Sequence, residues 1–488
     1  MTSGRCRHRQ IAIPLCLSLA LVGCTVGPTY QPPQLALPAQ FSPTLTSDAG
    51  DLAIWWHGWN DPKLDRLVAR GLAQNLDLAQ AAARVREARW QVTIASAAGK
   101  PQLSAEGSAS RTRLSRNSSI GSIASGPAGL AGAGLPGSDF SSFRTGFDAA
   151  WEIDLFGRTK RAVEAATARA EAAEWNRRDA QLVLIAEIAD RYLQYRAVQA
   201  RIAIADADLT TARDLRDVIA ARTGAGLGNT LDLRRQDQVV AGASAARAAL
   251  DAERDVLLHA LALLLGGAPD LLSHELADGP PAATSPPAIG PGLPSELLNR
   301  RPDIRAAERR LAAASADIGV ATADRLPKLN LTGAADLVST ALARLISGDS
   351  AQLSLAAGVT APLLDGGRGR ATVRLREEAY REAELGWRGT VHAALRDVAD
   401  ALSRQSADRA RLTALAAADA AARDALDTSR VRYRAGLTPF LDVLTAQAGS
   451  LAASDALAQA RAARDRDIVA LFKALGGGWQ EDAMEKAS

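Results

Sequence analysis

The 488-residue sequence is poor in aromatic side chains and nearly lacks cysteine. Phe, Trp and Tyr make up 4% of it although apolar residues reach 47%, so Ala, Leu and Val supply most of the apolar content. Alanine favours helices and buries little area per residue. This composition indicates helices that pack closely through small side chains rather than a core built on large rings. With 39 Gly and 21 Pro, a collagen-like or generally disordered chain is excluded.

Only one of the three cysteines, Cys24, lies outside an N-terminal leader. Three arginines precede an apolar run from Ile11 to Val22, which is typical of a secretory signal peptide and too short to cross a bilayer as a helix. The run ends in Leu21-Val22-Gly23-Cys24, which resembles the lipobox of bacterial lipoproteins. We expect residues 1–23 to be a lipoprotein signal peptide and Cys24 to carry a covalent lipid. A chance cysteine in a hydrophobic leader is the alternative.

Charge and histidine content argue against several other classes of protein. Of the 57 Lys and Arg, three precede Cys24, so 54 remain against 54 Asp and Glu, whereas a nucleic-acid binder would be expected to show a basic excess. The histidines lack metal-ligand spacing, and no catalytic constellation stands out. We therefore expect that the protein is not an enzyme. We also expect it to bind no metal, no cofactor besides the covalent lipid, and no nucleic acid. The histidines considered are His57, His259, His274 and His392.

The sequence repeats itself at two offsets. Pro101-Gln102-Leu103 recurs as Pro327-Lys328-Leu329 at an offset of 226. Gly157-Arg158 and Leu265-Gly266-Gly267 recur at an offset of 210, which places 16 extra residues of the first copy between Pro101 and Gly157. The chain therefore reads as a tandem duplication with one longer loop.

The duplication predicts the order of segments along the chain. Each repeat should contain a helix, a β-hairpin, a long helix and a return helix, and the first helix should run without a break from Asp61-Pro62 to Ala98. The expected segments are an anchor and extended Pro-rich segment at 24–60, a first repeat at 61–267 with its hairpin at 102–156, a Pro-rich connector at 268–296, a second repeat at 297–479 with its hairpin at 328–365, and a tail at 480–488.

The two long helices are predicted at Arg158–Arg222 and Arg368–Arg434 because neither stretch contains proline. About 65 residues at 1.5 Å per residue give roughly 97 Å. Their many charges exclude a membrane span, and a lone helix of this length is implausible in water. We therefore expect these helices to pack on each other and on other subunits.

The predicted hairpins carry a faint alternation of apolar and polar residues. We expect strands at Gln102–Ser115, Phe140–Leu155, Lys328–Leu337 and Ala351–Leu364, with an extracellular loop at 116–139. Strands of about ten residues with this alternation are typical of a transmembrane β-barrel, and two soluble hairpins are the alternative. The alternation is seen at Phe143, Thr145, Phe147 and Ala149, and at Leu353, Leu355, Ala357 and Val359.

Several longer motifs are similar to those of the TolC-like outer-membrane efflux proteins, in their lipoprotein (NodT-like) branch. The motifs are Cys24-Thr25-Val26-Gly27-Pro28, Trp55-Trp56 before Asp61-Pro62, Trp151-Glu152-Ile153-Asp154-Leu155-Phe156-Gly157-Arg158, Arg301-Pro302-Asp303-Ile304-Arg305-Ala306-Ala307-Glu308, Arg432-Tyr433 before Ala435-Gly436, and Leu475-Gly476-Gly477-Gly478-Trp479. They are spread over nearly all of the mature chain.

The resemblance implies a mostly α fold with a small transmembrane β part. Three subunits would each give four strands to one 12-stranded β-barrel and their long helices to one periplasmic tunnel. The expected protein is an outer-membrane, lipid-anchored homotrimer and a passive exit duct for small molecules such as drugs. An inner-membrane RND transporter would drive it through a periplasmic adaptor. The alternatives are the duct of an ABC-type (type I) protein secretion system and a non-channel periplasmic coiled-coil lipoprotein.

The resemblance also predicts a gate at the periplasmic tip. Leu441 and Asp442 would line the aperture, Tyr433 would help to latch it, and Thr445 stands where family members often have a second Asp. Threefold symmetry would make a ring of Asp442 carboxylates that favours cations. For Asp442 the alternative is a helix-start acid that complements the helix dipole. The first repeat offers Leu231 and Asp232 for a second ring, although Asp232 also fits a structural role.

Overall fold

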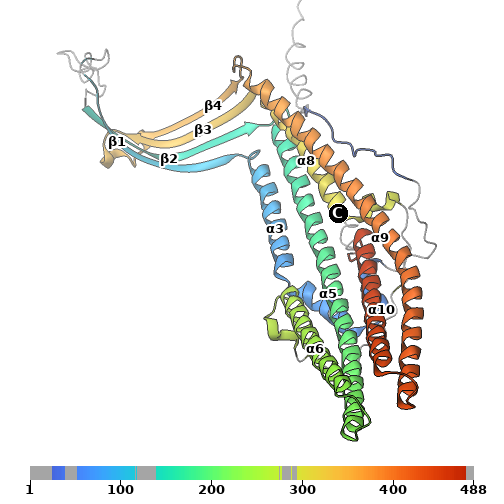
Figure 1. Cartoon of the computed structure of the whole chain (residues 1–488). Helices are drawn as coiled ribbons and strands as arrows, with labels where there is room; N and C mark the ends of the chain where they lie inside the picture. Colours follow the sequence, from blue (N-terminus) through green and yellow to red (C-terminus); the bar gives the residue numbers. More distant parts are fainter. Residues whose placement is uncertain are drawn as a thin grey trace, which may run out of the picture. The chain divides into compact units, whose positions relative to one another are not determined.

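The structure is a computed structural model that describes residues 25–38, 52–115, 117, 139–273, 275–276, 287 and 294–479. It is mostly helical, with one sheet (Figure 1). The chain forms two compact units. One comprises Met1–Pro32, Glu87–Ala170 and Arg309–Glu384, and the other Pro33–Arg86, Glu171–Glu308 and Leu385–Ser488, so each takes segments from both halves of the sequence. In the part of the chain that is described, no helix combines the length and apolar content that crossing a membrane requires.

The sheet has four antiparallel strands in the order β1-β2-β3-β4 (Figure 1). The strands are β1 (Gln102–Arg113), β2 (Asp139–Ile153), β3 (Lys328–Ser339) and β4 (Ala351–Thr360). The predicted fold class is confirmed, and pairing of β2 with β3 joins the two hairpins into one sheet. Strand β2 ends two residues before Leu155, since the Asp154 carboxylate turns back to accept a hydrogen bond from the Lys160 amide at 2.9 Å. Strand β4 ends before the predicted Leu364, and β3 continues two residues beyond Leu337.

The long helices begin at the predicted residues. The helices are α2 (Pro62–Gln74), α3 (Leu76–Ala97), α5 (Arg158–Gly224), α6 (Thr230–Leu264), α7 (Leu297–Arg300), α8 (Pro302–Ala323), α9 (Arg368–Arg434) and α10 (Phe440–Ala474), with short 3-10 turns η1 (Leu52–Trp59), η3 (Pro269–Leu272), η4 (Pro294–Glu296), η5 (Leu342–Arg344) and η6 (Gly348–Ser350). Helices α5 and α9 each contain 67 residues, which gives about 100 Å at 1.5 Å per residue.

The prediction of one unbroken helix from Asp61-Pro62 to Ala98 is wrong, because the chain breaks at Asn75. Asn75 has extended backbone angles, and its side-chain oxygen accepts a hydrogen bond from the Leu78 amide at 2.8 Å. It therefore starts α3 as an N-cap. Its side-chain nitrogen donates to the Leu264 carbonyl at 2.9 Å, which satisfies one of the free carbonyls at the end of α6.

The second repeat makes the same contact with a different residue. Arg301, at the offset of 226 from Asn75, separates α7 from α8 and donates from Nη1 to the Ala474 carbonyl at 3.1 Å. Ala474 lies at the offset of 210 from Leu264. An amide in one repeat and a guanidinium in the other thus close the C-terminal end of the return helix.

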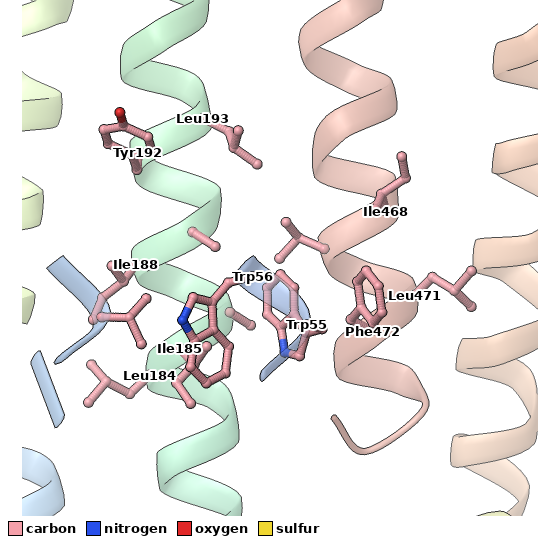
Figure 2. Close-up of a cluster of buried hydrophobic side chains, with 14 of the residues drawn as sticks. Trp55, Trp56, Leu184, Ile185, Ile188, Tyr192, Leu193, Ile468, Leu471 and Phe472 are labelled. Atoms are coloured by element: carbon pink, nitrogen blue, oxygen red, sulfur yellow. The ribbon is translucent and has the colours of Figure 1, made fainter. Parts of the chain in front are cut away.

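The largest core cluster surrounds the three tryptophans of η1 (Figure 2). The Trp55 ring stacks on Phe472 of α10 with 4.9 Å between ring centroids. The Tyr192 hydroxyl of α5 donates to the Asp61 carboxylate at 2.6 Å, and burial is the main cause that raises the pKa of Tyr192. These tryptophans form the packing centre of the second unit.

The buried side of α10 changes character along its length. After its first turns, which bury Phe440 and Val443, the buried residues are polar: Gln447 donates to Asp208 of α5 at 3.1 Å, and Ser454 donates to Asp419 of α9 at 2.5 Å. Near its end the buried residues are apolar, with Ile468, Val469, Leu471 and Phe472 in the core cluster. The stretch of α10 around Gln447 and Ser454 is thus held by hydrogen bonds, and its C-terminal end by apolar burial.

A carboxyl pair joins α9 and α10 beside the apolar C-terminal stretch of α10. Asp408 is buried on α9, and the half-buried Asp467 of α10 lies beside it. Burial first, and the Asp408 carboxyl second, raise the pKa of Asp467, while Arg404 at 3.9 Å opposes the shift. The folded protein therefore holds a proton on this pair more tightly than the unfolded chain does.

One face of the sheet carries an ion-pair network that requires a glycine. Arg144 of β2 contacts Asp148 at 3.0 Å and Asp336 of β3 at 2.8 Å. Gly146 lies opposite Asp336 in the register, and a Cβ atom there would come within 2.2 Å of Asp336 Oδ1 and 2.5 Å of the Ala335 carbonyl oxygen. Gly146 thus leaves the space through which Asp336 reaches Arg144.

We predict that Asp467→Asn raises the melting temperature at pH 7. An acid with a raised folded pKa makes the folded state lose stability as pH rises from the unfolded pKa of about 4 through the folded pKa. Asparagine is never ionised and still donates to Asp408, so this loss disappears. Thermal unfolding followed by circular dichroism in detergent should show the gain at pH 7 and a much smaller gain at about pH 4, where the wild-type acid is already half protonated in the unfolded chain. The exposed Asp424→Asn is the control, and an equal gain at both pH values would contradict the prediction.

We predict that Gly146→Ala lowers the amount of folded protein in the membrane fraction. The added methyl group would displace Asp336 and separate it from Arg144. Gly107→Ala on β1 is the matched control, because a Cβ atom at Gly107 meets nothing within 4 Å. Protease-resistant protein should fall in the first variant and remain at the wild-type level in the second. Equal amounts in both would show that the space at Gly146 is not required.

Candidate functional site

The sheet has one apolar and one polar face. In the register, Leu103 pairs with Ala149, Leu331 with Trp151 and with Ala357, and Leu329 with Val359, so these side chains lie on the same face. The opposite face carries Glu106, Arg144, Asp148, Asp336 and Gln352. The alternation predicted for β2 and β4 is therefore present across the whole sheet. A sheet of this kind can face lipid on one side and water on the other.

The two outer strands of the sheet have unpaired edges. Strands β1 and β4 each pair with one neighbour, and among the described residues no further strand adds to either. Every residue of both strands is exposed, including Leu353 and Leu355. Unpaired backbone groups are not tolerated in lipid, so a membrane-inserted form needs further strands at both edges.

The far ends of α5 and α9 close in two turns of the same type. Gly226 and Gly436 adopt φ values of 73° and 76°. The following amides turn back, with Leu227 donating to the Arg222 carbonyl at 2.8 Å and Leu437 donating to the Arg432 carbonyl at 2.9 Å. Both turns end the helix through a left-handed glycine, and the glycine-rich segment 223–229 is thus a helix-to-helix turn.

The predicted gate residues Leu441, Asp442 and Thr445 lie together on the exposed side of the first turns of α10. Leu441 is 56% exposed, and the Asp442 carboxylate accepts a hydrogen bond from the Thr438 hydroxyl. Thr445 donates from its hydroxyl to the Leu441 carbonyl at 2.9 Å. The opposite side of these turns is buried through Phe440 and Val443. The three residues thus form one surface patch, which we call the tip patch.

Tyr433 lies on the buried side of this tip instead of in the tip patch. Its ring packs on Phe440 with 5.6 Å between centroids, and the Arg222 guanidinium lies 5.2 Å from its ring centre. Burial raises the pKa of Tyr433, while Arg222 opposes the shift. The ring belongs to a small apolar cluster that joins α5, α6, α9 and α10 and comprises Ile219, Phe440 and Val443 with Leu215, Leu233, Tyr433 and Leu444.

The corresponding residues of the first repeat differ in charge. Leu231 is 50% exposed, close to the value for Leu441, but the half-buried Asp232 has Arg235 at 3.8 Å. Arg235 occupies the position of Thr445 at the offset of 210. Asp232 is therefore partly neutralised, whereas Asp442 has no ion pair among the residues that are described.

Arg222 and Arg235 are the residues of this tip that sequence reasoning missed. They line a hollow of about 770 Å³ between the two turns, together with Asp232, Tyr433 and Leu441. The repeat offset alone would have pointed to Arg235, because it aligns this arginine with Thr445 of the second repeat. Arg222 gave no such signal, since its role depends on packing against a ring of another helix.

Several predicted features fall outside the described residues: the signal peptide at 1–23, Cys24, the loop 116–139 apart from its residues 117 and 139, His274, and the tail at 480–488. In the described part of the chain, no group of three or more His, Cys, Asp or Glu side chains is arranged to hold a metal ion. His57 contacts the Asp65 carboxylate at 3.2 Å at the surface.

Comparison with known proteins identifies the family. The sequence matches the family described as outer membrane efflux protein over residues 67–267 and 293–477. It is 36% identical over 486 residues to the pyoverdine export outer membrane protein OpmQ of Pseudomonas aeruginosa, covering 96% of this chain and 97% of that one. It is 31% identical over 468 residues to nodulation protein T of Rhizobium leguminosarum bv. trifolii, covering 95% and 96%. The solved structure of the outer-membrane channel OprN superposes with a TM-score of 0.83 at 36% identity, covering 94% of this chain and 100% of that one. The chain belongs to the outer membrane efflux protein family, in its TolC-like, NodT-related branch.

Proposed function

We propose that three copies of this chain assemble into one lipid-anchored exit duct across the outer membrane and the periplasm. The observation that carries the proposal is the sheet with an apolar face, a polar face and two unpaired edges. Three such sheets, joined edge to edge, would close a barrel of twelve strands with its apolar face toward lipid. The unpaired edges of β1 and β4 would then pair with each other between neighbouring copies.

The helices supply the periplasmic part of the proposed duct. Helices α5 and α9 are about 100 Å long and carry exposed apolar side chains such as Leu375, Leu385 and Val431. Long helices with exposed apolar residues are stabilised by packing on other helices. A tunnel built from three copies would provide that packing.

The proposed partners are a periplasmic adaptor and an inner-membrane RND transporter, and the cargo is a class of small molecules. The relatives named above support this cargo class, since OpmQ is named for the export of pyoverdine. The proposed anchor is a lipid on Cys24. The experiment compares a deletion strain with a complemented strain. Loss of small-molecule efflux with normal secretion of proteins supports the proposal, whereas the reverse result would indicate a type I secretion duct.

We predict that Leu355→Arg abolishes insertion while Ser354→Arg is tolerated. The two residues are neighbours on β4 but lie on the apolar and the polar face. Arginine on a lipid-facing strand position costs about 2–4 kcal/mol near the bilayer midplane. Purified protein should give conductance steps in planar bilayers for wild type and Ser354→Arg but none for Leu355→Arg. A wild type without conductance would favour a coiled-coil lipoprotein that forms no channel.

We predict that Asp442→Ala lowers the cation selectivity of single channels. In the proposed trimer the tip patch faces the lumen, so three Asp442 carboxylates form a negative ring. Asp232→Ala should change selectivity less, because Asp232 already has Arg235 beside it. Reversal potentials in a salt gradient measure both variants. Unchanged selectivity in a folded Asp442→Ala channel would place the constriction elsewhere, and Leu441 is then the next candidate.

A further inference from the structure

The residues that follow Cys24 cross the joint where β2 ends and α5 begins. The Val26 amide donates to the Phe156 carbonyl at 3.1 Å. Gly157, with φ of 77°, lies directly under Thr25, and a Cβ atom at Gly157 would come within 2.8 Å of the Thr25 side chain. Thr25 and Val26 therefore pack directly on the backbone of the joint between β2 and α5.

Two further glycines bring this segment against α8. Gly27 has a φ of 92°, and a Cβ atom on it would lie 2.4 Å from the Cα atom of Gly319. A Cβ atom on Gly319 would in turn lie 2.8 Å from the stem of Arg161. The backbones thus meet without side chains between them, and any larger residue at Gly27 would be both strained and obstructed.

The buried side chain of Arg161 on α5 holds the segment in place. Arg161 is 6% exposed and donates from Nε to the Val26 carbonyl at 3.1 Å and from Nη2 to the Gly27 carbonyl at 3.3 Å. Its Nη1 pairs with Glu164 at 2.8 Å. Arginine stays charged, so losing both carbonyl acceptors would leave much of its guanidinium without partners in a buried site.

A ring contact continues the docking three residues further along. Tyr30 packs on Ala168 of α5 and on Ala312 and Ala313 of α8. The Arg309 guanidinium lies 5.8 Å from the centre of its ring. Residues 25–30 therefore contact the end of β2, the start of α5 and one side of α8.

We propose that Gly157, Arg161 and Gly319 form a docking site for residues 25–30, through which the anchor at Cys24 controls the strand-to-helix joint. The inference rests on the proposed lipid on Cys24. Consecutive Cα atoms are about 3.8 Å apart, so docking of Thr25 keeps the lipid attachment point next to the joint. The lipid keeps the segment at a high local concentration near the site, and the docked segment completes the surroundings of Arg161. Anchoring and folding of the joint are thereby coupled.

Coupling makes a distinct prediction for a double variant. Cys24→Ser removes the anchor, and Arg161→Ala removes the hydrogen bonds that hold the segment. If both act through the docked segment, the double variant should be no worse than the worse single variant. The readouts are the lipid on Cys24, by mass spectrometry of the mature N-terminus, and the amount of protease-resistant protein in the outer-membrane fraction.

We expect Arg161→Ala to keep its lipid and to give about tenfold less protease-resistant protein, since hydrogen bonds to a charged group are lost. Arg169→Ala is the matched control: Arg169 pairs with Asp317, which also joins α5 to α8, but it does not contact residues 25–30. Gly27→Ala disturbs the docked segment itself and leaves Arg161 in place. It should therefore lower the amount of folded protein as Arg161→Ala does, even if removal of Arg161 also damages α5.

Several results would overturn the coupling. Losses that multiply in the double variant, or an Arg169→Ala loss equal to that of Arg161→Ala, would mean that Arg161 serves α5 alone. A wild-type level of folded protein in Gly27→Ala would mean that docking is not needed. A wild-type protein without lipid on Cys24 would refute the proposed anchor and this inference together, whereas lipidated protein with multiplied losses refutes the coupling alone.

Discussion

The backbone hydrogen-bonding groups at the edges of β1 and β4 constrain this molecule more than any other feature. Within the described residues these strands pair on one side only, and lipid offers no partner for the other side. In the duct that we propose, the apolar face of the sheet lies in lipid, so other copies of the chain pair the two edges. A chain with four strands would then be complete only as part of that assembly. The exposed apolar side chains of the long helices lead to the same conclusion.

The duplication preserved positions better than it preserved chemistry. Asn75 and Arg301 hold equivalent helix ends with an amide and a guanidinium. At the tip, Asn229 caps α6 through its side chain, whereas Pro439 begins α10 and makes no such bond. Arg235 and Thr445 continue this pattern, so the two repeats present different charges around similar backbones. The two repeats thus share their backbone geometry and differ in the side chains that determine the role of each.

Much of the fold could be predicted from local signals. The long helices followed from proline-free stretches, and the tip turns followed from Gly226 and Gly436, which adopt the left-handed conformation that glycine allows. The break at Asn75 could not be predicted, since asparagine is only mildly unfavourable in a helix and its side-chain nitrogen binds a carbonyl 189 residues away. The tip patch was found by resemblance, but the burial of Tyr433 was not, because it depends on contacts among four helices.

Two stretches of α10 respond differently to temperature. Its C-terminal end is held by the hydrophobic effect, which weakens on cooling and gains strength toward growth temperature. The stretch around Gln447 and Ser454 is held by hydrogen bonds, whose formation carries no comparable heat-capacity change. Warming therefore widens the difference in local stability between the two stretches. The hydrogen-bonded stretch is the part that cold leaves comparatively firm and that warmth leaves comparatively free to open.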